Sequence, residues 1–270
     1  MDFSVLMSIY QKENPDFLRE SLQSIAGQTC PPAEIIMVED GPLTPALYAV
    51  LDEFQTVLPQ MRRLPQAQNQ GLGKALNIGL AACSFPLVAR MDTDDIALPH
   101  RFEQQTAAFA ADPALALCGS HAIEFSGTPE QVISRKQVPL SNEEIRRYAR
   151  RRNPFNHPTV MFKKQAVLDA GGYQHAMWFE DYYLWARMLA NGARAANIDD
   201  YLLYFRAGGD MYKRRGGIRY VRSALSVKWK IYRLGVSGLG DFICSGGAHI
   251  VVGLMPNGLR KRFYGKFLRK

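Results

Sequence analysis

The chain has 270 residues, of which 47% are hydrophobic and 21% are charged, and its formal net charge at pH 7 is +8. This apolar content suits a sizeable core, in one large domain or in one domain with an appendage, and it excludes a chain that is disordered throughout. The four cysteines stand far apart and match no zinc-binding spacing, so we expect reduced thiols that take no part in the chemistry.

The positive charge is concentrated toward the C-terminus. Residues 211–270 hold 14 lysines and arginines against a single acid, Asp241, whereas residues 1–210 hold 19 basic and 24 acidic residues. We therefore expect two regions, a catalytic domain over residues 1–210 and a basic helical tail over residues 211–270. Residues 1–9 lack the basic and apolar segments of a secretion signal, so we expect the catalytic part to face the cytosol.

The first hundred residues repeat the order strand, helix, strand. Each strand is a short apolar run of the kind found in parallel strands that are covered on both faces. The strands are predicted at residues 3–9, 34–38 and 87–91. The helices are predicted from Pro15, with Asn14 as N-cap and Gly27 at the end, from about residue 71 to 83, and from Pro99 onward. This alternation predicts an α/β sheet whose ligand site lies at the carboxyl ends of the strands.

Three carboxylates follow the third of these strands. They belong to Asp92, Asp94 and Asp95, which lie within four residues. Carboxylates this close repel one another unless a hard divalent cation or several hydrogen-bond donors compensate the charge. Such a cation is commonly bound by one or two carboxylates together with phosphate oxygens, so the run predicts a metal-bound diphosphate. From the run alone, an equally supported interpretation is that Asp92, Thr93 and Asp94 form the turn and N-cap before the helix at Pro99.

The second half of the chain contains shorter signals. A strand is predicted at residues 115–118, and a capping box of the form Ser-x-x-Glu opens a helix at Ser141. Residues 157–162 predict a strand that leads into a short helix and a Gly-Gly turn. Another helix is predicted from residue 181 to 190, where Asn191 and a glycine end it.

The order and spacing of these and other motifs resemble the inverting family 2 glycosyltransferases of bacteria, especially the amylovoran type that makes exopolysaccharide and lipopolysaccharide O-antigen. The resemblance covers residues 3 to about 215, and its specificity comes from the order of the motifs rather than from any one of them. The matching motifs lie at residues 4–10, 24–29, 38–41, 69–77, 92–95, 156–158, 171–173 and 180–181 and from Arg206 onward. The resemblance favours the metal-diphosphate interpretation of the acidic run over the turn interpretation.

This resemblance implies a GT-A fold, which is a Rossmann-like mixed sheet that binds a nucleotide-sugar and is flanked by helices, here followed by the basic helical tail. It implies an inverting hexosyl- or N-acetylhexosaminyltransferase with a Mn²⁺ or Mg²⁺ cofactor and a UDP-sugar donor. The acceptor is expected to be a glycan on a polyprenyl carrier such as undecaprenyl diphosphate. The motifs identify neither the sugar nor the linkage.

Three residues of the expected donor site lie near the ends of the first two strands. Asp40 matches the family position that hydrogen-bonds the uracil ring, and Ser8 and Tyr10 match the loop that lines the base pocket. Without the resemblance, we would interpret Asp40 as a turn carboxylate and the other two residues as the end of a strand. Glu39 departs from the family pattern, in which aspartate is commonest at this position.

The acidic run is expected to hold the metal. Asp94 and Asp95 are the expected metal ligands, and Asp92 is expected to contact the ribose or to complete the cluster. Lys74 or Arg90 would add positive charge near the diphosphate, where negative charge grows as the bond to the sugar breaks. The alternative for Lys74 is a solvated lysine on a helix surface.

Asp181, the second residue of the Glu180-Asp181 pair, is the expected catalytic base for the acceptor hydroxyl. At a helix N-terminus, the macrodipole and the free backbone N–H groups favour an ionised carboxylate, which can then accept a proton. The alternative, which we would prefer without the resemblance, is that Asp181 only caps its helix. His157 and Trp178 are secondary candidates for the acceptor pocket, although such residues most often belong to the core.

The basic tail predicts a helix with an apolar stripe and basic flanks. The stripe consists of Ile218, Val221, Leu225, Trp229 and Tyr232. Residues 235–256 are apolar but too interrupted for a good membrane span, so we predict peripheral docking on the anionic inner face of the cell membrane. The alternative is a helical subdomain that packs on the core. Arg206 and residues 211–215 are further candidates to fold over the donor diphosphate.

Two other functions are compatible with parts of the sequence. A nucleotidyltransferase that acts on sugar phosphates also combines an α/β fold with an aspartate-bound metal, but residues 11–15 lack its usual glycine-rich phosphate loop. A nucleic-acid binder without enzymatic activity would use the basic tail but would leave the aspartates unexplained. No nucleic-acid partner is therefore expected.

Overall fold

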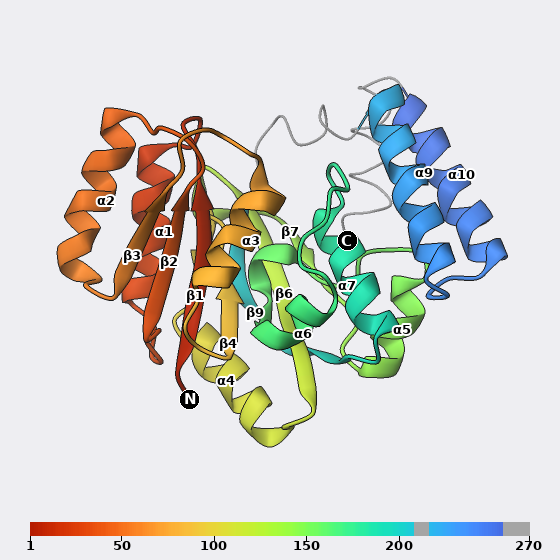
Figure 1. Ribbon diagram of the computed structural model, residues 1–270, viewed down its shortest axis with the longest axis horizontal. Helices are drawn as coiled ribbons and strands as arrows, with labels where there is room; N and C mark the ends of the chain where they lie inside the picture. The colour runs from red at the N-terminus through yellow and green to blue at the C-terminus, as the bar shows by residue number, and fades with distance from the viewer. Residues whose placement is uncertain (208–215, 256–270) are drawn as a thin grey trace.

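The computed structural model describes residues 1–207 and 216–255. Within these residues, the centre is a nine-stranded mixed sheet with the order β3-β2-β1-β4-β8-β6-β9-β5, in which β7 pairs with β6. The strands are β1 (Phe3–Ile9), β2 (Glu34–Glu39), β3 (Met61–Pro65), β4 (Leu87–Arg90), β5 (Ile96–Ala97), β6 (Leu115–Ser126), β7 (Thr128–Lys136), β8 (Met161–Lys163) and β9 (Arg194–Arg206). Because β1 to β4 run parallel, their carboxyl ends meet at one edge of the sheet (Figure 1).

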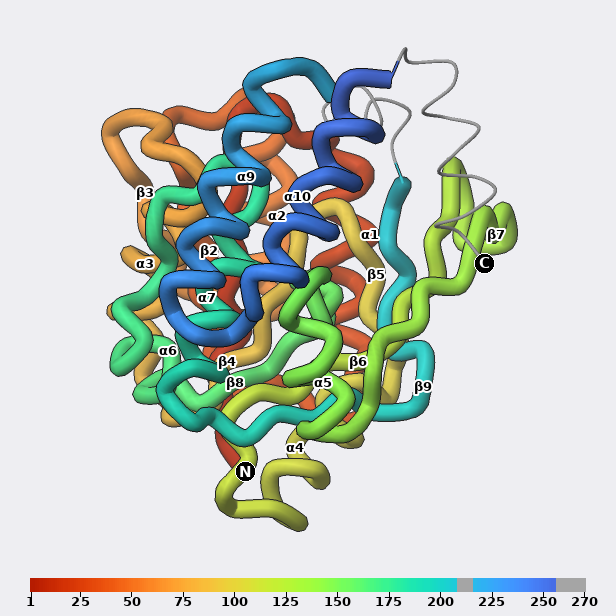
Figure 2. The backbone as a smooth tube through the Cα atoms, turned by 90° about the vertical axis from the view of Figure 1, so that its right-hand side faces the viewer, coloured from red at the N-terminus to blue at the C-terminus, as the bar shows by residue number. Residues whose placement is uncertain are grey.

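Helices cover both faces of this sheet, as the two views in Figure 1 and Figure 2 show. The helices on these faces are α1 (Pro15–Ala26), α2 (Pro45–Val57), α3 (Leu72–Ala82), α4 (Arg101–Ala111), α5 (Asn142–Ala149), α6 (Lys164–Asp169) and α7 (Glu180–Ala190), whereas α9 (Ile218–Arg233) and α10 (Leu239–Leu254) lie beyond α7. Helices α1, α2 and α4 pack on one face, where Val5 of β1 lies in a core with Leu22 and Phe102. Helices α3, α5, α6 and α7 pack on the other, where Leu6 lies in a core with Trp185. Neighbouring residues of one buried strand thus enter two different cores, as expected for a sheet covered on both sides.

Several helix ends agree with the sequence signals. Asn14 caps α1 by accepting a hydrogen bond from the backbone N–H of Asp16, and Gly27 follows the last residue of the helix. The predicted capping box at α5 is present, with Ser141 and Glu144 binding each other's backbone N–H groups. Such local hydrogen bonds involve neighbours in the chain, which explains why the sequence predicts them well.

The prediction for residues 157–162 is wrong in its first half. His157–Thr159 forms a 3₁₀ helix, and only Met161–Lys163 is a strand. Pro158 lacks an N–H group for a strand ladder, and the hydroxyl of Thr159 donates to the carbonyl oxygen of Asn156, which closes the turn. No prediction covered α2, β3, β7 or β9, and the strand predicted at residues 115–118 extends as β6 to Ser126.

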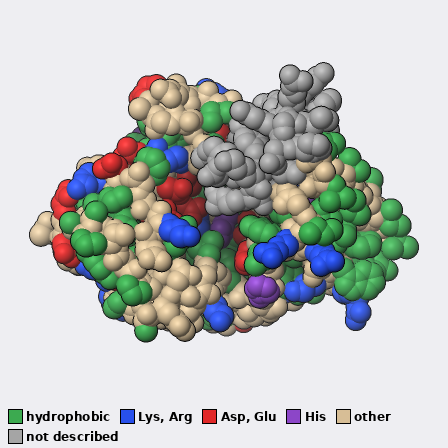
Figure 3. Space-filling model, turned by 90° about the horizontal axis from the view of Figure 1, so that it is seen from above, with side chains coloured by type: hydrophobic (Ala, Val, Ile, Leu, Met, Phe, Trp, Pro, Cys, Tyr) green, Lys and Arg blue, Asp and Glu red, His purple; other side chains and the backbone are tan. Residues whose placement is uncertain are grey.

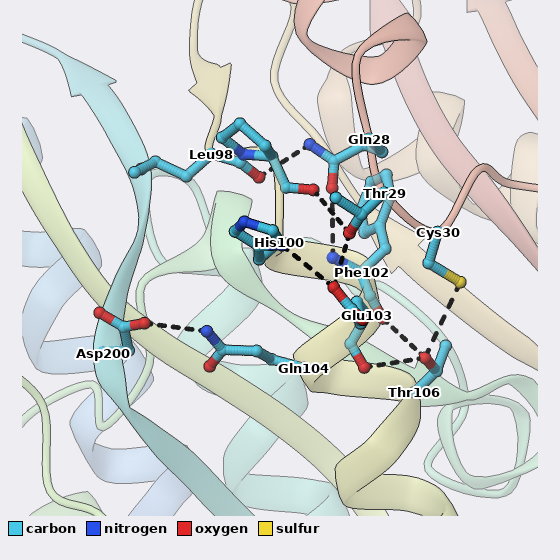
Figure 4. A network of polar contacts seen from close by, with 11 residues as sticks. Gln28, Thr29, Cys30, Leu98, His100, Phe102, Glu103, Gln104, Thr106 and Asp200 are labelled. Atoms are coloured by element: carbon cyan, nitrogen blue, oxygen red, sulfur yellow. Dashed lines mark hydrogen bonds and ion pairs between the residues drawn. The ribbon is translucent and has the colours of Figure 1, made fainter.

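The segment between the acidic run and α4 is anchored to the end of α1 (Figure 4). The amide of Gln28 donates to the carbonyl oxygen of Leu98 at 2.8 Å and accepts from the backbone N–H of Phe102 at 3.2 Å. The hydroxyl of Thr29 donates to the carboxylate of Glu103 at 2.7 Å. α4 therefore begins at Arg101, two residues later than predicted, and the short strand β5 separates it from the acidic run.

Helices α9 and α10 form a hairpin beside α7 (Figure 2). Val227 and Ile231 of α9 pack against Tyr182 and Ala186 of α7. None of the helices in the described part of the chain is long and apolar enough to cross a bilayer. The prediction for residues 211–215, and the part of the predicted tail at residues 256–270, lie outside the described residues.

The predicted apolar stripe of α9 agrees with its buried face only at Val221. Ile218 and Trp229 are 55% and 46% exposed. The buried residues of this helix are Tyr220, Val221, Ala224, Val227, Lys228 and Ile231. Lys228 can face inward because its ammonium group donates to the carbonyl oxygen of Arg151 at 2.7 Å, which replaces a hydrogen bond to water.

Candidate active site

The acidic and polar residues that follow β1, β2 and β4 gather at the carboxyl edge of the sheet. Figure 3 views this side of the molecule and shows a hollow near its centre, in which acidic and histidine side chains are visible. Ser8 lies partly exposed near the end of β1, Tyr10 is 36% exposed just after it, and Asp40 is buried after β2. Parallel strands place such residues together because their carboxyl ends share one edge.

Asp92, Asp94 and Asp95 form a compact acidic triad. One carboxylate oxygen from each residue lies within 4.8 Å of the others. Asp92 and Asp94 are partly exposed, whereas Asp95 is 1% exposed. Burial, and then the charge of Asp92, raises the pKa of Asp94 to about 6, and burial together with both neighbours raises the pKa of Asp95 well above its ordinary value. The triad therefore holds more negative charge than its surroundings compensate.

The donor set of the triad fits a hard divalent cation. Oδ2 of Asp95 is buried and has no hydrogen-bond partner among the described residues, although an unpaired buried carboxylate oxygen is costly. The other oxygen, Oδ1, accepts from the backbone N–H of Arg206 at 2.8 Å, which fixes the direction of the carboxylate. Oxygen ligands from two or three carboxylates, with part of the coordination shell open to solvent, are the ligands that Mg²⁺ and Mn²⁺ prefer.

Ser21 and Arg206 donate hydrogen bonds to the backbone of the triad. The hydroxyl of Ser21 in α1 donates to the carbonyl oxygen of Asp92 at 3.0 Å. The guanidinium of Arg206 donates to the carbonyl oxygen of Asp94 at 2.9 Å and to that of Gly127 at 2.8 Å, and it forms an ion pair with Glu20. Arg206 was expected to approach the donor diphosphate, but these contacts use its guanidinium to support the triad.

Arg90, the last residue of β4, borders the triad, and its charge also influences Asp181. It is 1% exposed and forms an ion pair with the carboxylate of Asp92. Its Nε and Nη1 atoms are buried without a hydrogen-bond partner among the described residues. Burial raises the pKa of Asp181 and lowers that of His157, and on each group the positive charge of Arg90 is a smaller influence toward a lower pKa. One buried cation therefore acts on both acidic parts of the site.

Asp181 is the second residue of α7, and Phe179 occupies the N-cap position. Its carboxylate accepts from the amide of Asn153 at 2.6 Å and from the backbone N–H of Tyr182 at 2.7 Å. Burial raises the pKa of Asp181, against the influence of these two hydrogen bonds. The side chain keeps a partly exposed position, so it is both oriented by the protein and accessible. Its position inside the first turn differs from that of an N-cap residue.

Next to Asp181, the loop before α7 is clamped to α3. The amide of Asn77 donates to the carbonyl oxygen of Tyr173 at 2.7 Å and accepts from its backbone N–H at 2.8 Å. Gly73 in the first turn of α3 approaches Glu180, and a Cβ at this position would lie 3.6 Å from the Glu180 side chain. Lys74 is exposed in the same turn. The folding of the chain therefore brings Lys74 near the start of α7.

His157 and Trp178, the two secondary candidates, lie in different environments. Nε2 of His157 is 3.0 Å from the hydroxyl of Tyr173, and burial lowers the pKa of His157 well below its ordinary value. The imidazole is thus neutral near pH 7, and it is partly exposed. Trp178 is 42% exposed, has a positive φ of 68° and contacts Tyr220 of α9 with its ring.

Asp40 and Glu39 take part in local structure. Both oxygens of Asp40 accept backbone N–H groups, from Gln70 at 2.7 Å and from Gly71 at 3.0 Å, so this carboxylate shapes the loop that leads to α3. Glu39 is buried and pairs with Arg63 of β3. Each oxygen of Asp40 has a second lone pair, so it can still accept a hydrogen bond from a ligand.

Sequence reasoning missed four residues that position the site. They are Asn77, Asn153, Tyr173 and, in its supporting role, Arg206. Asn77 and Tyr173 belong to motifs of the resemblance, at residues 69–77 and 171–173. The sequence therefore marks both positions, but it does not show that the two residues bind each other. Asn153 carries no sequence signal, because its hydrogen bond to Asp181 joins residues 28 positions apart.

Residues 4–172 match the sequence model of the family described as Glycosyl transferase family 2. The chain is 44% identical to the amylovoran biosynthesis glycosyltransferase AmsE of Erwinia amylovora, over 86% of this chain and 85% of the relative. It is 39% identical to the UDP-Gal:alpha-D-GlcNAc-diphosphoundecaprenol beta-1,3-galactosyltransferase of Escherichia coli, over 99% of this chain and 97% of the relative.

Two solved structures are similar to this fold. The mannosyltransferase PcManGT from Pyrobaculum calidifontis, in complex with GDP-Man and Mn²⁺, aligns with a TM-score of 0.66 at 14% identity, over 96% of this chain and 78% of the other. S. aureus TarS 1–349 in complex with UDP-GlcNAc aligns with a TM-score of 0.64 at 17% identity, over 99% of this chain and 72% of the other. The predicted GT-A fold, a mixed sheet flanked by helices, is thereby confirmed.

Proposed function

The chain belongs to Glycosyl transferase family 2, and from this premise we propose that it transfers a hexose or an N-acetylhexosamine from a UDP-sugar to a glycan on undecaprenyl diphosphate. The transfer inverts the anomeric carbon and serves the synthesis of a cell-surface polysaccharide, such as O-antigen or exopolysaccharide. The name of the E. coli relative, which specifies a UDP-Gal donor and a diphosphoundecaprenol-linked acceptor, supports both substrate classes because the identity extends over nearly the whole of both chains. The nucleotidyltransferase and nucleic-acid-binding alternatives have no such support.

The observation that carries this proposal is the unpaired buried oxygen of Asp95 in a carboxylate triad beside a buried arginine. Asp94 and Asp95 are the proposed ligands of a divalent cation. When bound, Mn²⁺ or Mg²⁺ supplies Lewis-acid stabilisation of the diphosphate leaving group. Asp92 is proposed to contact the ribose or to complete the cluster, because its ion pair with Arg90 already compensates part of its charge.

Asp181 is the proposed base. The acceptor hydroxyl gives its proton to the Asp181 carboxylate while its oxygen forms a bond to the anomeric carbon, and the bond from that carbon to the diphosphate breaks. A pKa raised by burial makes this carboxylate a stronger base than one on the surface, and the hydrogen bond from Asn153 holds it in one orientation. Such positioning matters because proton transfer requires the carboxylate within hydrogen-bond distance of the hydroxyl.

The remaining residues of the proposal bind the donor. Asp40, Ser8 and Tyr10 line the carboxyl ends of β1 and β2, where the uracil and its ribose are proposed to bind. Lys74, exposed at the start of α3, and Arg90 are the proposed cations near the diphosphate. Nε and Nη1 of Arg90 have no hydrogen-bond partner among the described residues. Such N–H groups are suited to donate hydrogen bonds to phosphate or sugar oxygens.

We propose that the reaction takes place at the inner surface of the cell membrane, because the polyprenyl chain of the acceptor remains in the bilayer. The excess of basic residues at positions 211–270 supports contact with anionic lipids.

A direct test is to incubate the purified protein with Mn²⁺, one of several UDP-sugars and a synthetic saccharide on a lipid diphosphate, and to identify the products by mass spectrometry. We expect free UDP and an acceptor that has gained one sugar with inverted configuration. Release of pyrophosphate would indicate a nucleotidyltransferase, and no turnover with any donor would contradict the proposal.

A further inference from the structure

The outward-facing side of α10 is apolar, whereas the polar residues of this helix lie on the inward-facing side. Five large aliphatic residues on the outward side are 40 to 63% exposed, and we call them the outer face of α10. They are Leu239, Ile243, Ile250, Val251 and Leu254. At 100° per residue, these positions lie within one continuous stripe of the helix, and no charged side chain of α10 interrupts it.

The polar residues of α10 occupy the opposite side. Asp241, Ser245 and His249 recur at intervals of four residues, and the first two of them are buried. The carboxylate of Asp241 accepts from Nε of Arg150 at 2.7 Å and from Nε of Arg151 at 2.6 Å. This arrangement is the reverse of the usual surface helix, in which the apolar side faces the protein.

Close packing prevents α10 from turning its apolar side inward. A Cβ at Gly253 would lie 2.5 Å from Val221 of α9, and a Cβ at Gly246 would lie 3.1 Å from Leu225. Glycines at these positions therefore let the two helices approach closely. Together with the ion pairs of Asp241, this contact fixes the rotation of α10 about its axis. The outer face is therefore exposed because of the way the helix packs.

Basic and aromatic residues border the outer face. Arg219, Arg222 and Arg233 are exposed on α9, and helical spacing places them on the same side as the half-exposed Trp229. The ring of Trp229 contacts that of Phe242 in α10, with ring centroids 5.7 Å apart, so this side of α9 adjoins α10. Figure 3 shows apolar side chains gathered at the end of the molecule formed by the hairpin, with Lys and Arg side chains beside them.

We propose that the outer face of α10 inserts into the anionic surface of a lipid bilayer, with the arginines of α9 on the lipid headgroups. An exposed apolar stripe with bordering arginines and an aromatic residue matches the layered chemistry of a membrane surface, in which acyl chains lie beneath negative headgroups. A second copy of this chain fits less well, because a symmetric pair on this face would bring two rows of arginines together. The inference rests on the proposed function, because the lipid-linked acceptor gives the docking its purpose.

The test uses the full-length protein with vesicles of phosphatidylcholine, with and without phosphatidylglycerol, and measures the bound fraction by sedimentation. The test variant is the double substitution Ile243→Ser with Val251→Ser, whose side chains are 63% and 58% exposed. The matched control is Val57→Ser with Leu168→Ser, which removes aliphatic side chains that are 52% and 43% exposed on α2 and α6. A third variant, Arg222→Gln with Arg233→Gln, removes two of the bordering charges.

We expect the unsubstituted protein and the control to bind the anionic vesicles and the Ile243/Val251 variant to bind them at least about tenfold more weakly. The arginine variant should lose roughly tenfold in affinity at low salt and little on neutral vesicles. Equal binding by the control and the Ile243/Val251 variant overturns the inference, as does absence of binding by the unsubstituted protein. A dimer that the Ile243/Val251 variant abolishes, without vesicle binding, would assign the face to contact between copies instead.

The docking and the proposed function can fail separately. Transfer to an acceptor with a short, water-dispersed lipid requires no bilayer, so it should be unchanged in the Ile243/Val251 variant. Transfer without vesicle binding would overturn the docking alone, and vesicle binding without transfer from any UDP-sugar would contradict the proposed function alone.

Discussion

The guanidinium of Arg90 and the carboxylate of Asp92 form an ion pair inside the protein, at the point where β4 ends and the acidic triad begins. The side chain of Arg90 is 2% exposed and that of Asp92 is 31% exposed. Arg90 is therefore a fixed counter-charge that neutralises part of the negative potential of the triad from inside the protein.

Replacing Arg90 should destabilise the metal-free protein. We expect Arg90→Met to lower the free energy of unfolding by about 2–3 kcal/mol, somewhat less than the loss of a fully buried pair because Asp92 is partly solvated. Urea unfolding with and without Mn²⁺ measures this effect. Because the variant triad would lack its counter-charge, Mn²⁺ should stabilise the variant more than the unsubstituted protein. An unchanged midpoint in the absence of metal would show that the pair has no role in stability.

Removing either proposed metal ligand should weaken metal binding. We expect Asp94→Asn and Asp95→Asn each to reduce the affinity for Mn²⁺ at least about tenfold, because each substitution removes one anionic ligand. Titration calorimetry measures the affinity. The control is Glu143→Gln, which removes an exposed carboxylate on α5 and should leave Mn²⁺ binding unchanged. Equal affinities in all three variants would place the cation elsewhere.

Metal binding should depend on pH through Asp94. Its pKa of about 6 in the folded, metal-free protein exceeds the ordinary value of 3.8, chiefly because of burial and then because of Asp92. Below pH 6, a proton therefore competes with the cation, and the rise in melting temperature caused by Mn²⁺ should be smaller at pH 5.5 than at pH 7.5. In the metal-free protein, the effect of pH on stability has the opposite sign. The folded state binds more protons than the unfolded chain between pH 3.8 and about 6, so this group makes the protein more stable as the pH falls through that interval.

The contribution of Asp94 can be isolated by substitution. In Asp94→Asn, the stabilisation by Mn²⁺ should be small at both pH values. A difference between pH 5.5 and 7.5 that survives this substitution would mean that another group governs it.

Asp181→Asn should lower the transfer rate by about 10²–10⁴ while donor binding remains nearly unchanged, because a neutral amide cannot accept the proton of the hydroxyl. The rate is measured by UDP release and donor binding by titration calorimetry. Asn153→Ala should have a smaller effect of the same kind, since it removes only the hydrogen bond that orients Asp181. The control is Glu180→Gln, at the neighbouring position. Loss of the fold in Asp181→Asn would instead favour a structural role.

Much of the fold could be predicted because its signals are local. The N-cap of α1, the capping box of α5 and the buried strand β1 depend on residues close together in the chain. Local spacing also identifies the acidic triad, since its three carboxylates come from four consecutive residues. The 3₁₀ helix after Asn156 was mistaken for a strand because an apolar run does not distinguish the two when a side chain closes the turn.

The contacts that complete the site could not be predicted, because they join residues that are far apart in sequence. Arg206 reaches the triad from a position more than a hundred residues later, and Asn77 reaches Tyr173 across 96 residues. A residue's type shows that it can form a hydrogen bond, but the partner is decided by how the sheet brings strands and helices together.

By itself, the sequence determined the family resemblance, the α/β alternation and the acidic run, because each depends on the spacing of residues along the chain. Only the tertiary structure decided which buried oxygen of the triad lacks a partner among the described residues, how Arg90 pairs with the triad, and which side of α10 faces outward. Apolar residues in a sequence predict the buried side of a helix, and α10 departs from that rule because two arginines of a neighbouring segment hold its single carboxylate inside.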